Sequence, residues 1–324
     1  MFQGKKVLVA GGTGLIGIPL VEMLLAQGAQ VRIASLDDPS RANPKAEFLR
    51  LDLTRLDNCL KACDGMDYVM NLLCIKGSPA VTNVRPASFF TPMILFNTCL
   101  MEAARQCKVQ GYLFTSTIGV YSPAEVFYED EVWKTFPSPN DRFAGWAKRM
   151  GELQVDAYRI EYNWKNITIV RPANVYGPYD NFDSINAMVV PSLIKRALNE
   201  NPLTVWGDGS SERDFIHARD VARGMLLAME KAPGQILNLG GGRGFSIKEL
   251  VETIVAQLDV KPKVVWDVTK PAGDKKRIMD ISRARAIGFE PQMSLAEGIK
   301  DTMAWYKQNS HQTGKRYDVF NTPA

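Results

Sequence analysis

A short apolar run, a glycine loop and an apolar helical pattern follow one another at the start of the chain. Val7–Ala10 predicts a strand buried on both faces, and Leu20–Leu25 has apolar residues at helical spacing before Gly28. The loop between them, Gly11–Gly17, places Gly11, Gly14 and Gly17 three positions apart. Glycine lets the backbone approach a pyrophosphate, and a helix N-terminus offers free N–H groups, so this order predicts a dinucleotide-binding βαβ unit. The alternative is a glycine-rich turn that binds no ligand.

Strands and helices alternate further along the first half of the chain, which predicts a Rossmann-type, doubly wound parallel sheet of the α/β class. The expected strands are Val31–Ala34, Phe48–Leu51, Tyr68–Leu73, Tyr112–Ser116 and Ile167–Val170. The expected helices include Met93–Cys107 and Phe143–Glu161.

After about Pro172 the spacing becomes less regular. Shorter strands are expected at Leu203–Trp206 and Ile236–Leu239, and helices are expected to begin at the capping boxes Ser246–Glu249 and Ser294–Glu297. This half is interpreted as a smaller C-terminal substrate-binding lobe.

The predicted domains are a dinucleotide-binding domain at residues 1–172 and the substrate-binding lobe at residues 173–310, with segments that cross between the lobes. Residues 311–324 form a polar tail that we expect to be mobile.

Charge and composition exclude several classes of protein. The net charge of +4 comes from 39 basic and 35 acidic residues, so nothing points to nucleic acid or to an anionic membrane. Two histidines, His217 and His311, are too few for a histidine-rich metal site, and no metal is expected. No signal peptide and no bilayer-length apolar run are seen, so we expect a cytoplasmic protein. The cysteines are expected to be reduced and mostly packed inside: Cys59, Cys63, Cys74, Cys99 and Cys107.

The acid that usually binds the adenosine ribose is absent or displaced. Ser35 stands at the end of the second expected strand, followed by Asp37 two positions later. Ser35 with Arg41 would accept a 2′-phosphate and favour NADP, whereas Asp37 reaching the ribose would favour NAD. We favour NADP, with the alternative that Arg41 is a solvated loop residue.

Asp52 and Leu53 follow the third expected strand. Asp52 is a candidate to bind the adenine amino group, with Leu53 beside it. The competing interpretation is that Asp52 or Thr54 caps the next helix. The loop residues expected to contact the cofactor are Gly11, Thr13, Gly14, Leu15, Ile16 and Gly17.

From about Lys5 to Trp305 the chain resembles the extended short-chain dehydrogenase/reductase family, also called NAD-dependent epimerase/dehydratases. Besides the glycine loop, the resemblance rests on Phe114–Tyr121, Ala147–Glu152, Arg171–Pro178, Trp206–Gly209, Arg213–His217 and Asp280–Ala284. Such enzymes exchange a hydride between a nicotinamide cofactor and a sugar carbon. The family resemblance also implies a homodimer through the two long helices, Met93–Cys107 and Phe143–Glu161.

Tyr176–Phe182 is similar to the branch that contains GDP-fucose synthase, which implies a GDP- or UDP-linked sugar as substrate. Cations and an aromatic face suit a diphosphate and a base. Lys195 also matches that pocket but is better explained as surface charge. The expected substrate contacts are Thr117, Asn174, Val189, Arg196, Trp206, Arg213 and Arg277. The alternative is that the cations among them are ordinary surface charge and that the tryptophan packs in the core.

The resemblance also assigns the catalytic positions. Thr117 matches the hydroxyl that holds the substrate oxygen, and Lys148 matches the lysine that lowers the pKa of a catalytic tyrosine and binds the cofactor. The tyrosine should lie four residues before Lys148, where Ala144 stands. Alanine cannot transfer a proton.

Three explanations for Ala144 compete. The chain is an engineered inactive variant, or a natural member that uses water or another acid such as Tyr121 or Tyr128, or the register is wrong. A wrong register is the weakest explanation, because Lys148 fixes which position should carry the tyrosine, and the neighbouring Phe143 has no phenol either. We favour the engineered variant.

Two further departures narrow the expected reaction. Gly119 and Met188 stand where fucose synthase carries its cysteine and histidine, so a double epimerisation at C3 and C5 is not expected. Ile118 and Gly119 replace the Asp-Glu pair of the dehydratases. A 4-epimerase or a 4-ketoreductase remains. The alternatives are a non-catalytic NAD(P)-binding sensor or scaffold, and a reductase of non-nucleotide carbonyls, against which Arg213 and Arg277 argue.

Overall fold

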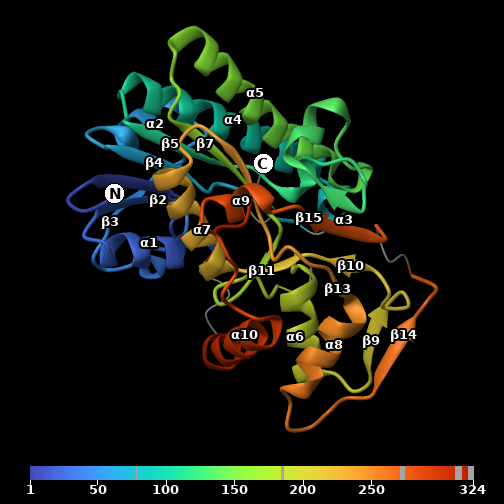
Figure 1. Ribbon diagram of the computed structural model, residues 1–324. Helices are drawn as coiled ribbons and strands as arrows, with labels where there is room; N and C mark the ends of the chain where they lie inside the picture. Colours follow the sequence, from blue (N-terminus) through green and yellow to red (C-terminus); the bar gives the residue numbers. More distant parts are fainter. Residues whose placement is uncertain (78, 184–185, 271–273, 311–315, 320–324) are drawn as a thin grey trace.

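A parallel sheet of seven strands organises the protein in the computed structural model, which describes residues 1–77, 79–183, 186–270, 274–310 and 316–319 (Figure 1). The strand order is β12-β7-β5-β4-β1-β2-β3, and every neighbouring pair is parallel. This confirms the predicted doubly wound α/β class. The strands are β1 (Lys6–Ala10), β2 (Gln30–Ser35), β3 (Glu47–Arg50), β4 (Tyr68–Asn71), β5 (Gly111–Thr115), β7 (Ile167–Pro172) and β12 (Ile236–Leu239).

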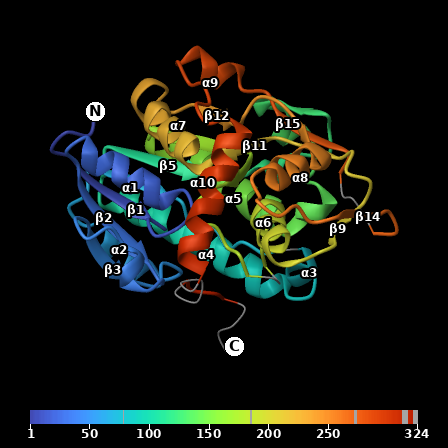
Figure 2. The same ribbon diagram turned by 90° about the horizontal axis from the view of Figure 1, so that it is seen from below.

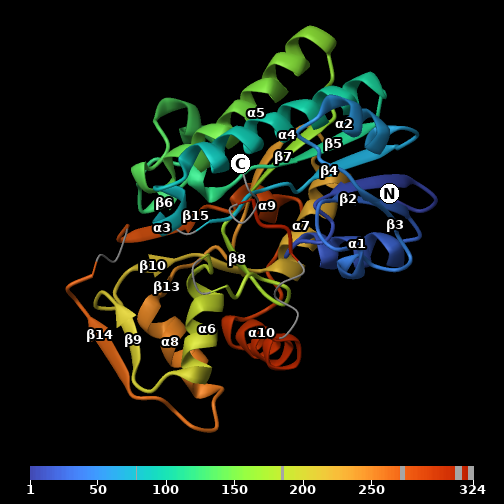
Figure 3. The same ribbon diagram turned by 180° about the vertical axis from the view of Figure 1, so that it is seen from behind.

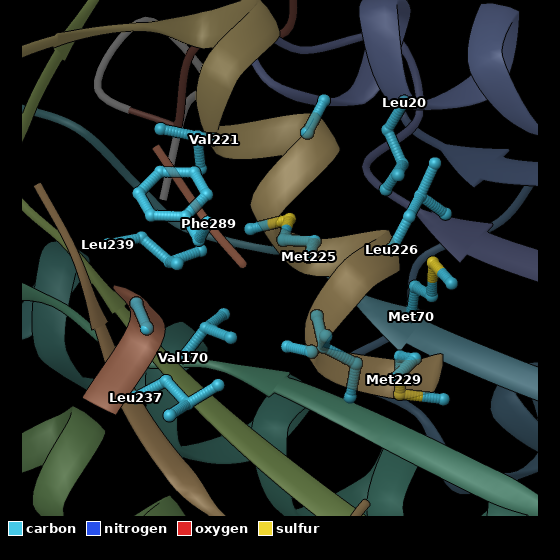
Figure 4. Close-up of a cluster of buried hydrophobic side chains, with 14 of the residues drawn as sticks. Leu20, Met70, Val170, Val221, Met225, Leu226, Met229, Leu237, Leu239 and Phe289 are labelled. Atoms are coloured by element: carbon cyan, nitrogen blue, oxygen red, sulfur yellow. The ribbon is translucent and has the colours of Figure 1, made fainter. Parts of the chain in front are cut away.

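Helices cover both faces of this sheet. On one face lie α1 (Gly17–Ala26) and α7 (Ala218–Lys231), whose apolar side chains meet those of the sheet in the core shown in Figure 4. The other face is covered by α2 (Leu56–Cys63), α4 (Pro86–Gln106) and α5 (Arg142–Tyr162). Apart from the edge strand β3, the strands are largely buried on both faces, which explains why they appear in the sequence as apolar runs.

Several predicted boundaries differ from the observed ones. β4 ends at Asn71 rather than Leu73, because the Asn71 side chain accepts a hydrogen bond from Leu73 N at 3.0 Å and turns the chain out of the sheet. α4 begins at Pro86, seven residues before the predicted start. Proline is favourable in the first turn of a helix, where its missing N–H costs nothing.

The remaining elements build a smaller lobe, seen at the bottom of Figure 1 and from other sides in Figures 2 and 3. Its helices α6 (Val189–Asn199), α8 (Ile247–Ala256) and α10 (Leu295–Asn309) share a hydrophobic core. Both predicted capping boxes form, at Ser246 and at Ser294.

Three small sheets complete this part of the fold. β8 (Asn174–Tyr176) pairs with β11 (Phe215–His217), and β9 (Leu203–Trp206) pairs with β14 (Val264–Asp267). The third sheet has the order β13-β10-β15-β6 and consists of β6 (Val126–Phe127), β10 (Glu212–Arg213), β13 (Phe245–Ser246) and β15 (Lys276–Met279). The short elements are α3 (Pro79–Thr82), α9 (Ser282–Ala286), η1 (Pro39–Arg41), η2 (Ile118–Val120), η3 (Glu129–Lys134) and η4 (Pro139–Asp141).

The chain crosses between the two parts in both directions. β12, expected within the C-terminal lobe, joins the large sheet beside β7. In return, β6 from the first half of the chain pairs with β15 of the small sheet. No helix among the described residues is both long enough and apolar enough to cross a membrane.

A buried ion pair fixes α5 against the sheet. Arg171 of β7 and Glu152 of α5 are joined by two hydrogen bonds of 2.9 and 2.7 Å, and both side chains are almost fully buried. The Ser116 hydroxyl donates to the same carboxylate at 2.5 Å. This network holds the helix that carries Ala144 and Lys148 in one position relative to the end of β5.

Candidate active site

The glycine loop passes directly from β1 into α1. Gly11 has a φ of +81°, which favours glycine, and a Cβ at Gly17 would lie 2.3 Å from the Gly11 carbonyl oxygen. No side chain caps α1, because its N-cap residue is Ile16. The first turn of the helix is therefore uncapped and suits a pyrophosphate, with the residues Gly11–Gly17 around it.

A cluster of polar side chains closes the far side of this loop. The buried Thr13 hydroxyl lies 2.7 Å from Asp37 Oδ2 and 2.8 Å from Ser35 Oγ. Arg41 Nη2 donates to Thr13 O at 3.2 Å, and Arg41 Nε lies 3.7 Å from Asp37 Oδ2. Burial lowers the pKa of Arg41, and the neighbouring Asp37 carboxylate opposes this effect. With its side chain 11% exposed, Arg41 is not the solvated loop residue of the alternative interpretation.

Asp52 and Leu53 lie in the turn before α2. Thr54 donates to Asp52 Oδ1 from both its N–H and its hydroxyl, at 3.0 and 2.7 Å. The N-cap of α2 is Arg55, so the capping role considered for Asp52 or Thr54 is wrong, and Asp52 instead stabilises the turn. Leu53 is buried. The adenine contact of Asp52 remains a prediction.

The substrate-oxygen candidate Thr117 lies next to the first turn of α5. It is the N-cap of η2, and its Oγ1 accepts a hydrogen bond from Gly119 N at 3.2 Å. A Cβ at Gly145 would lie 2.4 Å from Gly119 O, so η2 and α5 are in close contact. Ala144 precedes Gly145 and is partly buried against the cluster beneath α5. Thr117 and Ala144 therefore lie in two segments that contact each other through Gly119 and Gly145.

Lys148 lies one turn further along α5 and is 1% exposed. Its Nζ donates to Leu73 O at 2.9 Å and lies 5.2 Å from the centre of the Phe114 ring. Burial lowers the pKa of Lys148, while Cys74 and Glu152 oppose the shift. The positive charge of Lys148 is thus poorly solvated, and a neighbouring anion would stabilise it.

The segment after β4 connects Lys148 with the glycine loop. A Cβ at Gly11 would lie 3.4 Å from Leu72 C and O and 3.6 Å from Leu73 Cδ2. The same segment supplies the carbonyl that holds Lys148. A dinucleotide on the glycine loop would thus extend toward Thr117 and Lys148. This role of Leu73 could not be predicted from residue types, because a main-chain oxygen accepts the hydrogen bond.

Tyr121, considered as a substitute acid, belongs to a buried structural network. Its hydroxyl donates to Asn238 Oδ1 at 2.6 Å and accepts from Arg171 Nη1 at 3.0 Å. Burial raises the pKa of Tyr121 to about 12. It is therefore a poor proton carrier at neutral pH. Tyr128 is about half exposed and precedes η3.

The two arginines expected at the diphosphate lie side by side. Arg213 and Arg277 are register partners on β10 and β15. Arg277 Nη2 lies 2.7 Å from Asp141 Oδ2, and its Nη1 lies 3.8 Å from Asp274 Oδ2. Asp141 directly precedes α5, so this ion pair connects the lobe to the helix of Ala144 and Lys148. Asp141 was not predicted as a site residue, since an isolated acid before a helix looks like a simple cap.

The other expected substrate residues fall at three places. Asn174 begins β8 and donates from Nδ2 to Asp214 O at 2.9 Å, while Val189 begins α6. Arg196 is paired with Glu200 at 2.9 Å and donates to the Thr204 carbonyl on β9. Trp206 ends the same strand and is 60% exposed. Arg196 of α6 thus contacts β9 two residues before Trp206.

Leu15 lines a cavity of about 370 Å³ beside α10. His217 and Asp301, whose Nε2 and Oδ2 are 3.3 Å apart, line it as well. The residues around this cavity do not include Thr117 or Lys148. Among the described residues no three His, Cys, Asp or Glu side chains gather as metal ligands.

Comparisons with known proteins agree with this fold. Residues 7–240 match the family described as "NAD dependent epimerase/dehydratase family". "Probable GDP-L-fucose synthase 1" of Oryza sativa subsp. japonica is 30% identical over 95% of this chain and 93% of the relative. "dTDP-4-dehydro-6-deoxy-D-allose reductase" of Streptomyces bikiniensis is 28% identical over 95% of this chain and 98% of the relative. The structure of UDP-glucose 4-epimerase from Thermotoga maritima with UDP-glucose is 29% identical, with a TM-score of 0.82 over 94% of this chain and 99% of that one.

Proposed function

We propose, since this chain belongs to the NAD dependent epimerase/dehydratase family, that it binds NAD(P) and a nucleoside diphosphate sugar and exchanges a hydride at sugar C4. The reaction is either 4-epimerisation or reduction of a 4-keto sugar. The observation that carries the proposal is the link between Lys148, the Leu73 carbonyl and the glycine loop, which aligns an acid–base helix with a cofactor site. The names of the relatives, a fucose synthase, a keto-sugar reductase and a 4-epimerase, support both forms of the reaction.

The protein residues would divide the work as follows. The uncapped N-terminus of α1 and the backbone of Gly11 and Gly14 hold the pyrophosphate. When bound, the nicotinamide supplies the hydride chemistry. The Thr117 hydroxyl donates a hydrogen bond to the sugar oxygen, while its Oγ1 stays fixed by Gly119 N. Lys148 places a positive charge next to that oxygen and favours its deprotonated form.

Arg213 and Arg277 are proposed to bind the diphosphate of a GDP- or UDP-linked sugar, because two neighbouring guanidinium groups match its charge and geometry. Thr117, Asn174, Val189, Arg196 and Trp206 complete the proposed substrate site. Such an anion-binding pair argues against a substrate that carries no phosphate. We further propose a homodimer through α4 and α5, a cytoplasmic location and a preference for NADP.

Ala144 supports a second candidate function. The tyrosine that usually transfers the proton is absent, and the Tyr121 hydroxyl is hydrogen-bonded to Asn238 and Arg171. A protein that binds cofactor and substrate without turnover would act as a sensor or scaffold. An alanine at position 144 fits both this role and an inactive enzyme variant.

Titration of the purified protein with NADPH and NADH, followed by turnover assays with a panel of GDP- and UDP-sugars, separates these functions. We expect cofactor and nucleotide-sugar binding with slow conversion at C4. Binding without any conversion, even after Ala144→Tyr, would support the sensor. Failure to bind either cofactor would contradict the proposed function.

A further inference from the structure

The described end of the chain lies against the cofactor site. Tyr317 donates its backbone N–H to Asp37 Oδ1 at 2.7 Å, although the two residues are 280 positions apart. Val319 packs against the hydrophobic cluster that contains Ala34 and Leu53. The contact of Tyr317 lies just after the carboxyl end of β2, where the adenosine ribose is expected. Residues 316–319 belong to the tail that is expected to be mobile, and these two contacts are made by its described part.

Arg316 precedes this anchor and lies beside Arg41. The charge of Arg316 contributes to the lowered pKa of Arg41, after the larger effect of burial. Nη1 of Arg316 and Nε of Arg41 are buried, and neither forms a hydrogen bond within the part of the chain that the structure describes. Buried guanidinium N–H groups without an acceptor are unfavourable, so the pair is suited to an acceptor from outside the chain.

Asp37 does not neutralise both cations. Its carboxylate accepts the Thr13 hydroxyl and the Tyr317 N–H, and it lies 3.7 Å from Arg41 Nε. Among Asp37, Arg41 and Arg316 one positive charge is therefore in excess. A ribose hydroxyl would have to share Asp37 with two existing donors, whereas a phosphate would bring acceptors to the two arginines.

Building on the proposed function, we propose that Arg316 determines cofactor specificity by binding, together with Arg41, the 2′-phosphate on the adenosine ribose of NADP(H). Guanidinium groups bind phosphate with paired, charge-assisted hydrogen bonds. The C-terminal segment then forms one wall of the cofactor site. Tyr317, through its backbone contact with Asp37, positions Arg316.

Calorimetric titration of the full chain with four ligands tests this assignment: NADPH, NADH, 2′,5′-ADP and 5′-AMP. Arg316→Ala should bind NADPH and 2′,5′-ADP at least tenfold more weakly, about 1.4 kcal/mol, without a matching loss for NADH and 5′-AMP. Arg316→Lys should restore part of the affinity because the charge returns. Arg55→Ala, which removes the exposed arginine at the N-cap of α2, is the matched control and should bind all four ligands like the wild type.

Each other outcome has a definite meaning. Equal losses for both cofactors, or no loss, would overturn the role of Arg316 while leaving the proposed function intact. If removal of residues 311–324 tightened the binding of both cofactors, the segment would be a cover over the site rather than part of it. Wild-type protein that binds neither cofactor would overturn the proposed function and this inference together.

Discussion

Arg213 and Arg277 stand directly opposite each other on the parallel strands β10 and β15. Burial lowers the pKa of Arg213, and the neighbouring charge of Arg277 adds to the shift. Two like charges held together in this way favour an anion between or above them. The Asp141 carboxylate partly neutralises the charge of Arg277, so anion binding by the two arginines is coupled to the start of α5.

Replacing Arg213 should weaken nucleotide binding. Arg213→Ala removes one of the two phosphate ligands, and we expect at least a tenfold loss of affinity for GDP- or UDP-sugars, about 1.4 kcal/mol. Isothermal titration calorimetry measures it, with the exposed Lys261→Ala in the same lobe as control. Unchanged affinity would remove Arg213 from the diphosphate site.

Restoring a tyrosine at position 144 should restore chemistry. Proton transfer by a positioned side chain contributes about 10²–10⁴-fold in rate, so Ala144→Tyr should raise turnover by roughly 10²-fold or more with little change in substrate affinity. Its activity should also acquire a basic limb in the pH profile, set by a phenol whose pKa Lys148 lowers.

Steady-state kinetics on both forms decide this prediction, and Ala144→Phe is the matched control because it adds the ring without the hydroxyl. If the Ala144 protein already turns over at ordinary rates, about 1–10³ per second, another group carries the proton.

Gly151 should tolerate no side chain. A Cβ there would lie 2.3 Å from Phe114 Cζ, so Gly151→Ala forces α5 away from β5. Overpacking of this kind costs about 1–3 kcal/mol of unfolding free energy, and it should also displace Lys148 from the Phe114 ring. Urea unfolding tests it against Met150→Ala, at a neighbouring exposed position. Equal stability of the two variants would mean that the ring moves aside freely.

Asp214 should make stability depend on pH. Burial raises the pKa of Asp214 to about 7, against the opposing effect of N–H donors from Gly241, Met279 and Gly242. The folded protein then holds a proton that the unfolded chain has lost, so this group's contribution to stability falls as pH rises from about 4 to 7.

Denaturation of wild type and Asp214→Asn across this range measures the effect. The variant should show a flatter dependence of unfolding free energy on pH, because asparagine does not titrate. Parallel curves for the two proteins would show that Asp214 has the same pKa in both states.

The large sheet could be predicted from the sequence because parallel strands buried on both faces leave apolar runs that are easy to recognise. The neighbour of each strand in the sheet was harder to predict. Ile236–Leu239 has the expected strand pattern, but no local sequence signal predicts that it pairs with β7. β6 is only two residues long and leaves no periodic signal.

The candidate site divides in the same way. Lys148 and the Ala144 position follow from a spacing of one helical turn, which the structure keeps on one helix. The Leu73 carbonyl and the Tyr317 N–H are main-chain groups, so their roles cannot be predicted from the type of residue. Asp141 meets Arg277 only because two distant segments fold together.

The exchange of β6 and β12 between the two parts of the fold has a consequence for synthesis on the ribosome. When residue 172 emerges, the outer edge of β7 has no neighbour, and β6 has none until Lys276–Met279 is made. An open strand edge can pair with another chain. The nascent protein therefore has unpaired strand edges until β12 and then β15 are made, and proteolysis between the lobes would leave two fragments that each lack a strand.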